Sequence, residues 1–145
     1  MAPSKRFKPV QRVAKSREQN AAKELGNSQR NVRDQESKLE ELKRYHREYL
    51  EQFESSARQG MSASQLLEYR AFISKLELAI AEQEKIVLAS KSDCSTKKEQ
   101  WQHKHVRTKV LNKVMDRYTT AENRASEKKD QKETDDRNQR GRGRS

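Results

Sequence analysis

Residues 55–62, Ser-Ser-Ala-Arg-Gln-Gly-Met-Ser, decide the fold, because several turn signals meet in this stretch. Gly60 suits the left-handed backbone conformation that commonly follows the end of a helix. Ser62, with Gln65 three residues later, fits a capping box, in which both side chains satisfy free backbone N–H groups at a helix start. The stretch therefore predicts one helix that ends before Gly60 and a second helix that begins near Ser62.

The sequence on either side of this turn is almost free of helix breakers. Pro9 is the last proline of the chain. Between Pro9 and Gly60 the sequence has a single glycine, Gly26. A glycine inside a helix costs about 1 kcal/mol relative to alanine, so we expect Gly26 to be tolerated. These features predict helices over residues 9–58 and 62–127, with a turn over residues 59–62.

The composition limits the class of fold. Hydrophobic residues make up 30% of the chain and charged residues 38%, with four glycines and two prolines. Globular chains average about 45–50% apolar residues, so a multilayered core is not expected. The scarcity of turn residues argues against sandwiches, barrels and doubly wound sheets. Long helices with a narrow apolar stripe, or a disordered chain, remain.

Apolar residues recur every seven residues on both sides of the turn, with a companion column three residues on. This period is typical of a coiled-coil seam. In the first half the two columns are Leu25, Val32, Leu39, His46, Phe53 and Ser28, Gln35, Leu42, Tyr49, Ser56. In the second half they are Leu66, Ile73, Ile80, Val87, Cys94, Trp101, Thr108, Met115 and Tyr69, Leu76, Gln83, Ser90, Lys97, Lys104, Leu111, Tyr118.

The two seams predict an antiparallel pairing. With the turn centred near Met61, the residue numbers of facing partners should sum to about 122, which pairs Phe53 with Tyr69 and Glu18 with Lys104. A slip by one heptad would also keep the columns aligned. The predicted fold class is all-α, a long two-helix antiparallel coiled-coil hairpin over residues 9–127. A basic extension over residues 1–8 precedes it, and a disordered, basic C-terminal tail over residues 128–145 follows it.

The positive charge is concentrated toward the two termini. The chain carries a net charge of +11, of which residues 1–30 contribute +6 and residues 91–120 contribute +5. Residues 31–60 and 61–90 each carry −1. A solvated helix surface is the plain explanation of many charges, but the segregation favours an anionic partner at the terminal end of the hairpin.

One flank of the predicted hairpin carries aromatic residues near the turn. Tyr45 lies on this flank of the first helix, and Phe72 and Ala79 lie on the same flank of the second. Because like flanks of an antiparallel pair share one side, we expect Tyr45 beside Phe72 and Ala79. Exposed apolar patches commonly mark protein–protein sites. The alternative is that Tyr45 and Phe72 simply cover the narrow seam.

The sequence predicts neither an enzyme nor a cofactor or metal site. His103 and His105 project about 200° apart on a helix, so they cannot share a metal ion. Cys94 and His46 occupy seam positions, where packing is the usual role. A single cysteine permits no intrachain disulfide and indicates an intracellular protein. No stretch approaches the ~18 consecutive apolar residues of a membrane span.

Nucleic-acid binding is the alternative function that the charge alone allows. It rests on the net charge of +11 and on the Arg-Gly-Arg-Gly-Arg run at residues 140–144. A basic zipper does not fit, because its basic region would continue into a parallel leucine zipper. Here the first helix is expected to stop before Gly60.

Two segments carry a resemblance to a known family. Arg6-Phe7-Lys8-Pro9-Val10 opens the first helix, and Gly-Met-Ser-Ala-Ser-Gln-Leu at residues 60–66 leads into Tyr-Arg-Ala-Phe-Ile-Ser-Lys-Leu at residues 69–76. These segments resemble the FliJ family of flagellar export proteins. The likeness extends over residues 5–120.

The resemblance implies a soluble component of bacterial flagellar type III export, built as a long antiparallel coiled coil. It implies a cytoplasmic location, peripheral to the inner membrane at the flagellar base. The implied partners are the hexameric export ATPase, the cytoplasmic domain of the membrane export gate and the export chaperones. No cofactor, small-molecule substrate or nucleic acid is implied.

The resemblance implies the residues of one binding surface, and the location of the positive charge suggests those of a second. The positions that match the family's gate-binding patch are Leu42, Tyr45, Tyr49, Phe72, Leu76 and Ala79. Leu42, Tyr49 and Leu76 are seam positions, so both arguments agree on Tyr45, Phe72 and Ala79. For the ATPase ring, the basic terminal end offers Lys5, Arg6, Lys8, Arg12, Lys109 and Lys113.

Overall fold

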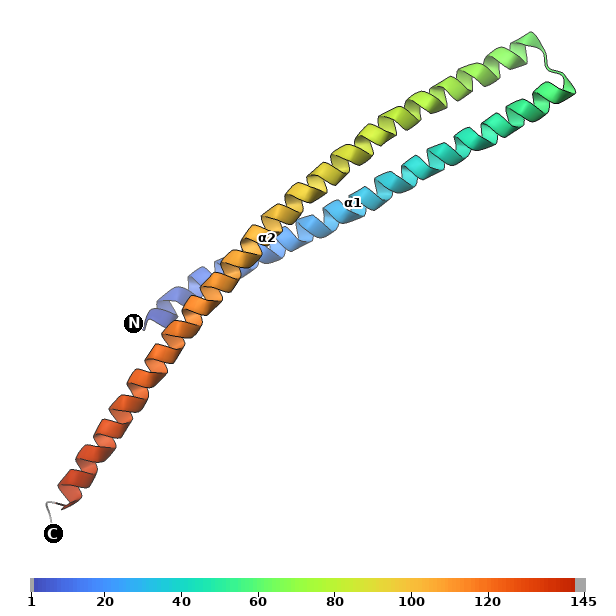
Figure 1. The fold of residues 1–145 in the computed structure, drawn as a ribbon. Coiled ribbons are helices and arrows are strands. Elements are labelled where there is room, and N and C mark those ends of the chain that lie inside the picture. The colour runs from blue at the N-terminus through green and yellow to red at the C-terminus, as the bar shows by residue number, and fades with distance from the viewer. Residues whose placement is uncertain (1, 143–145) are drawn as a thin grey trace. The chain divides into compact units, whose positions relative to one another are not determined.

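The computed structural model describes residues 2–142, and this part of the chain forms two long α-helices and no strands. Helix α1 spans Pro3–Gln59 and helix α2 spans Ala63–Arg142. Figure 1 shows the two helices running antiparallel and joined by the short turn. The predicted all-α fold class, with two helices packed against each other, is confirmed.

The turn has the predicted chemistry. Gly60 adopts a positive φ of 96°, and its N–H donates to the Ala57 carbonyl oxygen at 3.3 Å. The capping box is present as well: the Gln65 N–H donates to Ser62 Oγ at 3.1 Å, and the Ser62 N–H donates to Gln65 Oε1 at 3.2 Å. The prediction of a helix end before Gly60 and a new helix after Ser62 is confirmed.

The glycines of α1 and the turn give a stability test. Gly60 needs its positive φ, so we expect Gly60→Ala to lower the free energy of unfolding by about 1 kcal/mol. A Cβ added at Gly26 meets nothing within 4 Å and removes a helix-interior glycine, so Gly26→Ala should raise that free energy by about 1 kcal/mol. Urea denaturation followed by circular dichroism measures both. If both substitutions changed the free energy of unfolding equally, Gly60 would not need its positive φ.

The core is the predicted narrow seam. Within residues 2–142, every buried side chain occupies one of the heptad columns or its continuation toward the N-terminus. The buried apolar residues are Ala14, Ala21, Leu76 and Val87, and the buried polar ones are Ser28, Gln83, Ser90 and Thr108. Most of these side chains are small, which lets the two helices approach closely.

The buried polar groups of the seam are satisfied. Ser28 and Ser90 donate to carbonyl oxygens one turn earlier in their own helices, each at 2.7 Å. Gln83 Nε2 donates across the seam to Gln35, to its carbonyl oxygen at 3.0 Å and to Oε1 at 2.8 Å. An unpaired buried polar group would cost about 1–3 kcal/mol, so these bonds make a partly polar seam tolerable.

The chain divides into two compact units, each made from both helices. Unit 2, residues 22–100, contains the turn. In it the Phe53 and Tyr69 rings meet edge-on at 5.8 Å, as the register predicted. Across the same seam His46 Nε2 lies 3.3 Å from Glu77 Oε1, and Lys97 Nζ lies 3.6 Å from Glu24 Oε2. These contacts confirm the predicted register and exclude a slip by one heptad.

Unit 1 consists of residues 1–21 and 101–145, which include both termini. Thr108 Oγ1 donates to the Ala14 carbonyl oxygen at 3.4 Å, and Gln11 Nε2 donates to Asn112 Oδ1 at 2.6 Å. Near the start of α1, the Phe7 and Tyr118 rings meet at 5.7 Å. The register therefore holds in unit 1 too, with one correction: Glu18 pairs with His105 rather than with the predicted Lys104.

Both helices extend beyond their predicted bounds. Helix α1 begins at Pro3, so residues 3–8 of the predicted basic extension are helical, and Pro9 lies inside the helix. Helix α2 continues past residue 127 to Arg142, because no strong breaker precedes Gly141 and the segment is rich in helix-forming Lys, Glu, Gln and Arg. Residues 123–142 are all exposed, in accord with a tail that buries nothing. Residues 143–145 of that predicted tail lie outside the described part.

Candidate functional site

An aromatic surface in unit 2 consists of Tyr45, Tyr49 and Phe72. Phe72 is 39% exposed, and its ring lies on that of Tyr49, with 4.2 Å between centroids and 34° between planes. Tyr45 is 40% exposed, with the Arg44 guanidinium 5.5 Å from its ring centroid and its hydroxyl 3.4 Å from Glu41 Oε1. Exposed rings that are held by neighbours lose little conformational freedom on binding, which suits them to anchor a partner.

The six residues matched to a gate-binding patch fall into three classes of exposure. Tyr45 and Phe72 are exposed, and Leu42, Tyr49 and Ala79 are half-buried. Leu76 is only 8% exposed, so its side chain belongs to the seam. The expected neighbour of Phe72 was Tyr45, but its ring contact is with Tyr49. The aromatic flank is therefore tied to the seam and still open to a partner.

A basic groove of about 800 Å³ lies in unit 1 between α1 and α2. Of the predicted basic residues it brings together Lys8, Arg12 and Lys109, and it adds Lys15, which was not among them. The remaining lining residues are Gln11, Glu18, His105, Thr108, Asn112 and Asp116. Lys5, Arg6 and Lys113 are exposed but lie outside the groove lining.

Glu18 of α1 and His105 of α2, two residues that line the basic groove, are joined by a hydrogen bond. His105 Nδ1 donates to Glu18 Oε1 at 2.6 Å, and the His105 ring stacks on Trp101 with 4.9 Å between centroids and 13° between planes. The hydrogen bond from His105 holds the pKa of the Glu18 carboxyl below its ordinary value of 4.5. Closer to the start of α1, Ser4 donates to Glu122 from its hydroxyl at 2.7 Å and its N–H at 3.0 Å, which lowers the pKa of Glu122.

These carboxylates predict acid sensitivity. A carboxyl with a lowered pKa stabilises the folded state above its ordinary pKa, and this stability is lost as the pH falls through the lowered value. Below a pH of 4.5 we therefore expect the melting temperature of the wild-type chain to fall. The melting temperature of the Glu18→Gln variant should fall less than that of the wild type between about pH 6 and about pH 3. Thermal melts by circular dichroism measure this, with Glu40→Gln, an exposed site on α1, as control. An equal fall in Glu18→Gln and wild type would contradict the role of Glu18.

The net charge is divided unequally between the units. Residues 1–21 and 101–145 carry 19 basic and 8 acidic residues, which gives the whole net charge of +11. Residues 22–100 carry 14 of each and are neutral. The aromatic surface therefore belongs to a neutral unit and the basic groove to a strongly positive one.

Unit 1 also exposes an apolar strip. Val106 and Val110 of α2 are 58% and 53% exposed, and Val114 beside them is half-buried. A shallow pocket of about 270 Å³ in the same unit is lined by Pro9, Val10, Val13, Ala14, Arg17 and Arg107. The sequence did not predict Val10 and Val13 to be part of an exposed apolar surface. Their spacing of three residues, next to the seam residue Ala14, is the signal that could have found them.

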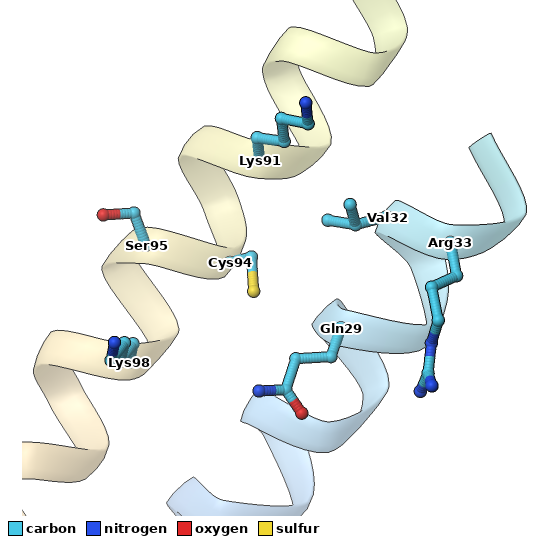
Figure 2. Close-up of a pocket in the computed structure, with 7 residues that line it drawn as sticks. All are labelled: Gln29, Val32, Arg33, Lys91, Cys94, Ser95 and Lys98. Carbon is cyan, nitrogen blue, oxygen red and sulfur yellow. The ribbon is translucent and has the colours of Figure 1, made fainter. Parts of the chain in front are cut away.

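A pocket in unit 2 surrounds Cys94. Figure 2 shows the Cys94 thiol between α2 and α1, beside Val32 and Gln29. Arg33, Lys91, Ser95 and Lys98 complete the lining of this open space of about 500 Å³. Cys94 is half-buried in the seam, as predicted. Among residues 2–142 no three His, Cys, Asp or Glu side chains gather as a metal site would require.

Comparison with known families decides what kind of protein this is. The family described as Flagellar FliJ protein matches residues 3–145, essentially the whole chain. The chain belongs to the FliJ family. FliJ proteins are components of the bacterial flagellar export apparatus. Comparison with curated proteins and with solved structures found no match. The resemblance seen in the sequence is confirmed at the level of the family.

None of the helices within residues 2–142 has the length and apolar character needed to cross a membrane.

Proposed function

We propose that this FliJ-family chain links the flagellar export ATPase ring to the cytoplasmic domain of the membrane export gate. The observation that carries the proposal is the separation of two unlike surfaces into two units. Unit 1 holds the whole net charge of +11 and the basic groove, and neutral unit 2 holds the exposed rings of Tyr45 and Phe72. Two partners of different chemistry could therefore bind one chain at once.

The gate domain is the partner proposed for unit 2. Phe72 and Tyr45 supply aromatic contact area, and aromatic residues carry much of the binding energy at protein interfaces. Ala79, half-buried on the same flank, extends the contact. Leu42, Tyr49 and Leu76 support this surface from the seam, and Tyr49 does so by direct ring contact with Phe72.

The ATPase ring is the partner proposed for unit 1. Lys8, Arg12, Lys15 and Lys109 converge on one groove, and Lys5, Arg6 and Lys113 add positive charge around it. Such a field attracts an acidic surface and speeds its association. We propose that the chain acts by favouring particular conformations of its partners.

The proposal includes a location and a third class of partner. The chain would work in the cytoplasm, held at the inner membrane at the flagellar base through the gate domain. Export chaperones would bind there as well. The apolar strip of Val106, Val110 and Val114 is open to the chaperones, because the proposed binding of the ATPase ring and of the gate domain does not involve it.

Nucleic-acid binding is the second candidate, since unit 1 is strongly basic. Parallel titrations of the chain with duplex DNA and with the purified export ATPase, at several salt concentrations, separate the two. We expect saturable binding to the ATPase at physiological salt and only weak, steeply salt-dependent binding to DNA. Tighter binding to DNA than to the ATPase at physiological salt would overturn the proposed function.

A further inference from the structure

Helix α2 carries a second apolar stripe that the hairpin does not use. Leu67, Leu78 and Leu88 are 66%, 66% and 68% exposed, the highest values among the exposed large apolar residues of the described chain. Between them the stripe continues, at spacings of three and four residues, through Ala71, Ser74, Ala81 and Lys85, all exposed. We call Leu67, Ala71, Ser74, Leu78, Ala81, Lys85 and Leu88 the outer stripe.

The outer stripe has the geometry of another helix-packing seam. Residues spaced by three and four lie on one face of a helix, and this face points away from the columns that contain Leu76 and Gln83. Ala71, Ser74 and Ala81 are small, so a facing helix can approach closely between the leucines. All of the outer stripe lies in unit 2.

Charged residues flank the outer stripe on both sides. Arg70 and Glu77 follow one side, and Glu68 and Lys75 follow the other. Within the part of the chain that the structure describes, Glu68, Arg70 and Lys75 take part in no ion pair. Glu77 faces His46 at 3.3 Å, but its side chain is 61% exposed and retains room for a second partner.

The charges are complementary to a second copy of the same stripe. Like flanks face each other in an antiparallel coiled coil. When Leu67 of each copy faces Leu78 of the other, Arg70 of each copy faces Glu77 of the other. On the opposite flank Glu68 of each copy then faces Lys75 of the other. The two-fold axis passes between Ala71 and Ser74, so the smallest residues lie at the centre.

Other registers bring like charges together. Sliding one copy by one heptad toward the C-terminus places Glu77 opposite Glu77 and Lys75 opposite Lys75. Sliding it by two heptads places Arg70 opposite Lys91 and Glu77 opposite Glu84. Like charges directly opposite one another weaken association, so the flanks select the register that pairs Leu67 with Leu78.

We propose that two copies of this chain associate antiparallel through the outer stripe, in the register that pairs Leu67 with Leu78. The contact spans about five helical turns, from Ser64 to Ala81, which is short for a permanent dimer. The association is therefore weak and reversible, in the micromolar to millimolar range of dissociation constant. It does not depend on the proposed function.

Sedimentation equilibrium of the full chain tests this, at loading concentrations from micromolar to millimolar. The wild type should show a monomer–dimer equilibrium, and Leu78→Asp should remain monomeric. Leu88→Asp is the matched control, because Leu88 is equally exposed but lies beyond the paired region. It should dimerise like the wild type. A wild-type chain that is monomeric throughout, or a Leu88→Asp chain as impaired as Leu78→Asp, would overturn the proposal.

A charge swap tests the register. Glu68→Lys places a lysine opposite Lys75 in both symmetry-related pairs of that flank and should weaken association roughly tenfold or more. Glu68→Lys/Lys75→Glu exchanges the two charges and should restore it. Circular dichroism should show unchanged helicity in both, since neither side chain takes part in an ion pair of the hairpin. A double variant as weak as Glu68→Lys would contradict the register.

Cross-linking places the two copies directly. In a Cys94→Ser background, a chain with Ala71→Cys is mixed with a chain with Ser74→Cys and oxidised. The mixed disulfide dimer should form readily, because these positions meet at the two-fold axis. A chain with Leu88→Cys in place of Ser74→Cys should cross-link far less. Equal yields in the two mixtures would overturn the proposal.

Discussion

The Phe72→Ala variant is expected to bind the cytoplasmic domain of the export gate roughly thirtyfold more weakly than the wild type, a loss of about 2 kcal/mol. Phe72 is 39% exposed and rests on the Tyr49 ring at 4.2 Å, so it presents a fixed apolar anchor. Truncation to alanine removes this anchor and its aromatic contact area. Isothermal titration calorimetry with the purified gate domain measures the change.

The control for Phe72 is Leu50, which is 37% exposed on the opposite flank. Leu50→Ala should leave gate binding unchanged, and circular dichroism should show wild-type helicity for both variants. Leu76→Ala should behave differently, lowering the melting temperature because Leu76 is 8% exposed and part of the seam. If Phe72→Ala loses helicity, or if Leu50→Ala weakens gate binding equally, the aromatic surface is not the gate-binding site.

The triple variant Lys8→Glu/Arg12→Glu/Lys109→Glu should lose most of its affinity for the export ATPase, by about a hundredfold at low salt. These three residues line one groove in the unit that holds the whole net charge of +11, and each substitution replaces a positive charge by a negative one. An acidic partner surface would then meet repulsion in place of attraction. Surface plasmon resonance with the immobilised ATPase measures the change.

A second triple variant has the same net charge but leaves unit 1 intact. Arg33→Glu/Lys38→Glu/Arg47→Glu alters three exposed cations of unit 2. It should bind the ATPase within a few-fold of the wild type, while the wild-type affinity falls as salt is raised. Equal losses in the two triple variants would mean that net charge alone governs binding, and the basic groove would then have no special part.

Much of the fold follows from local chemistry that can be read from single residues. Gly60, Ser62 and Gln65 specify the turn, and their backbone geometry and hydrogen bonds are those expected. The heptad columns identified the seam, because a two-helix hairpin has little else to bury. The register followed from the turn, and the Phe53–Tyr69 ring contact agrees with it.

Other features depend on details that a column of residues does not contain. The sequence predicts helix bounds at Pro9 and residue 127. Helix α2 continues past residue 127 because the polar segment there has good helix propensity, whereas propensity does not explain why α1 already begins at Pro3, before Pro9. Glu18 was assigned to Lys104, but the His105 ring is held against Trp101 and reaches the carboxylate instead. Side-chain direction, which a column cannot give, decides such pairs.

Some features of the candidate surfaces could be predicted from the sequence and others could not. Tyr45 and Phe72 could be placed on an exposed flank from their spacing alone, and they are exposed. The contact between the Phe72 and Tyr49 rings could not be predicted in this way, because it depends on how the two rings are tilted. The outer stripe gives only a weak signal in the sequence, because its leucines lie eleven and ten residues apart, with alanine, serine and lysine between them.

The most direct test of the account is whether one chain holds both partners at the same time. The export ATPase is immobilised, the purified chain is added, and capture of the gate domain is measured with wild type, Phe72→Ala and the Lys8→Glu/Arg12→Glu/Lys109→Glu variant. We expect the wild type to retain the gate domain on the ATPase. Phe72→Ala should bind the ATPase but retain little gate domain, and the triple variant should fail at the first step. Release of the wild-type chain from the ATPase when the gate domain is added would contradict a linking role.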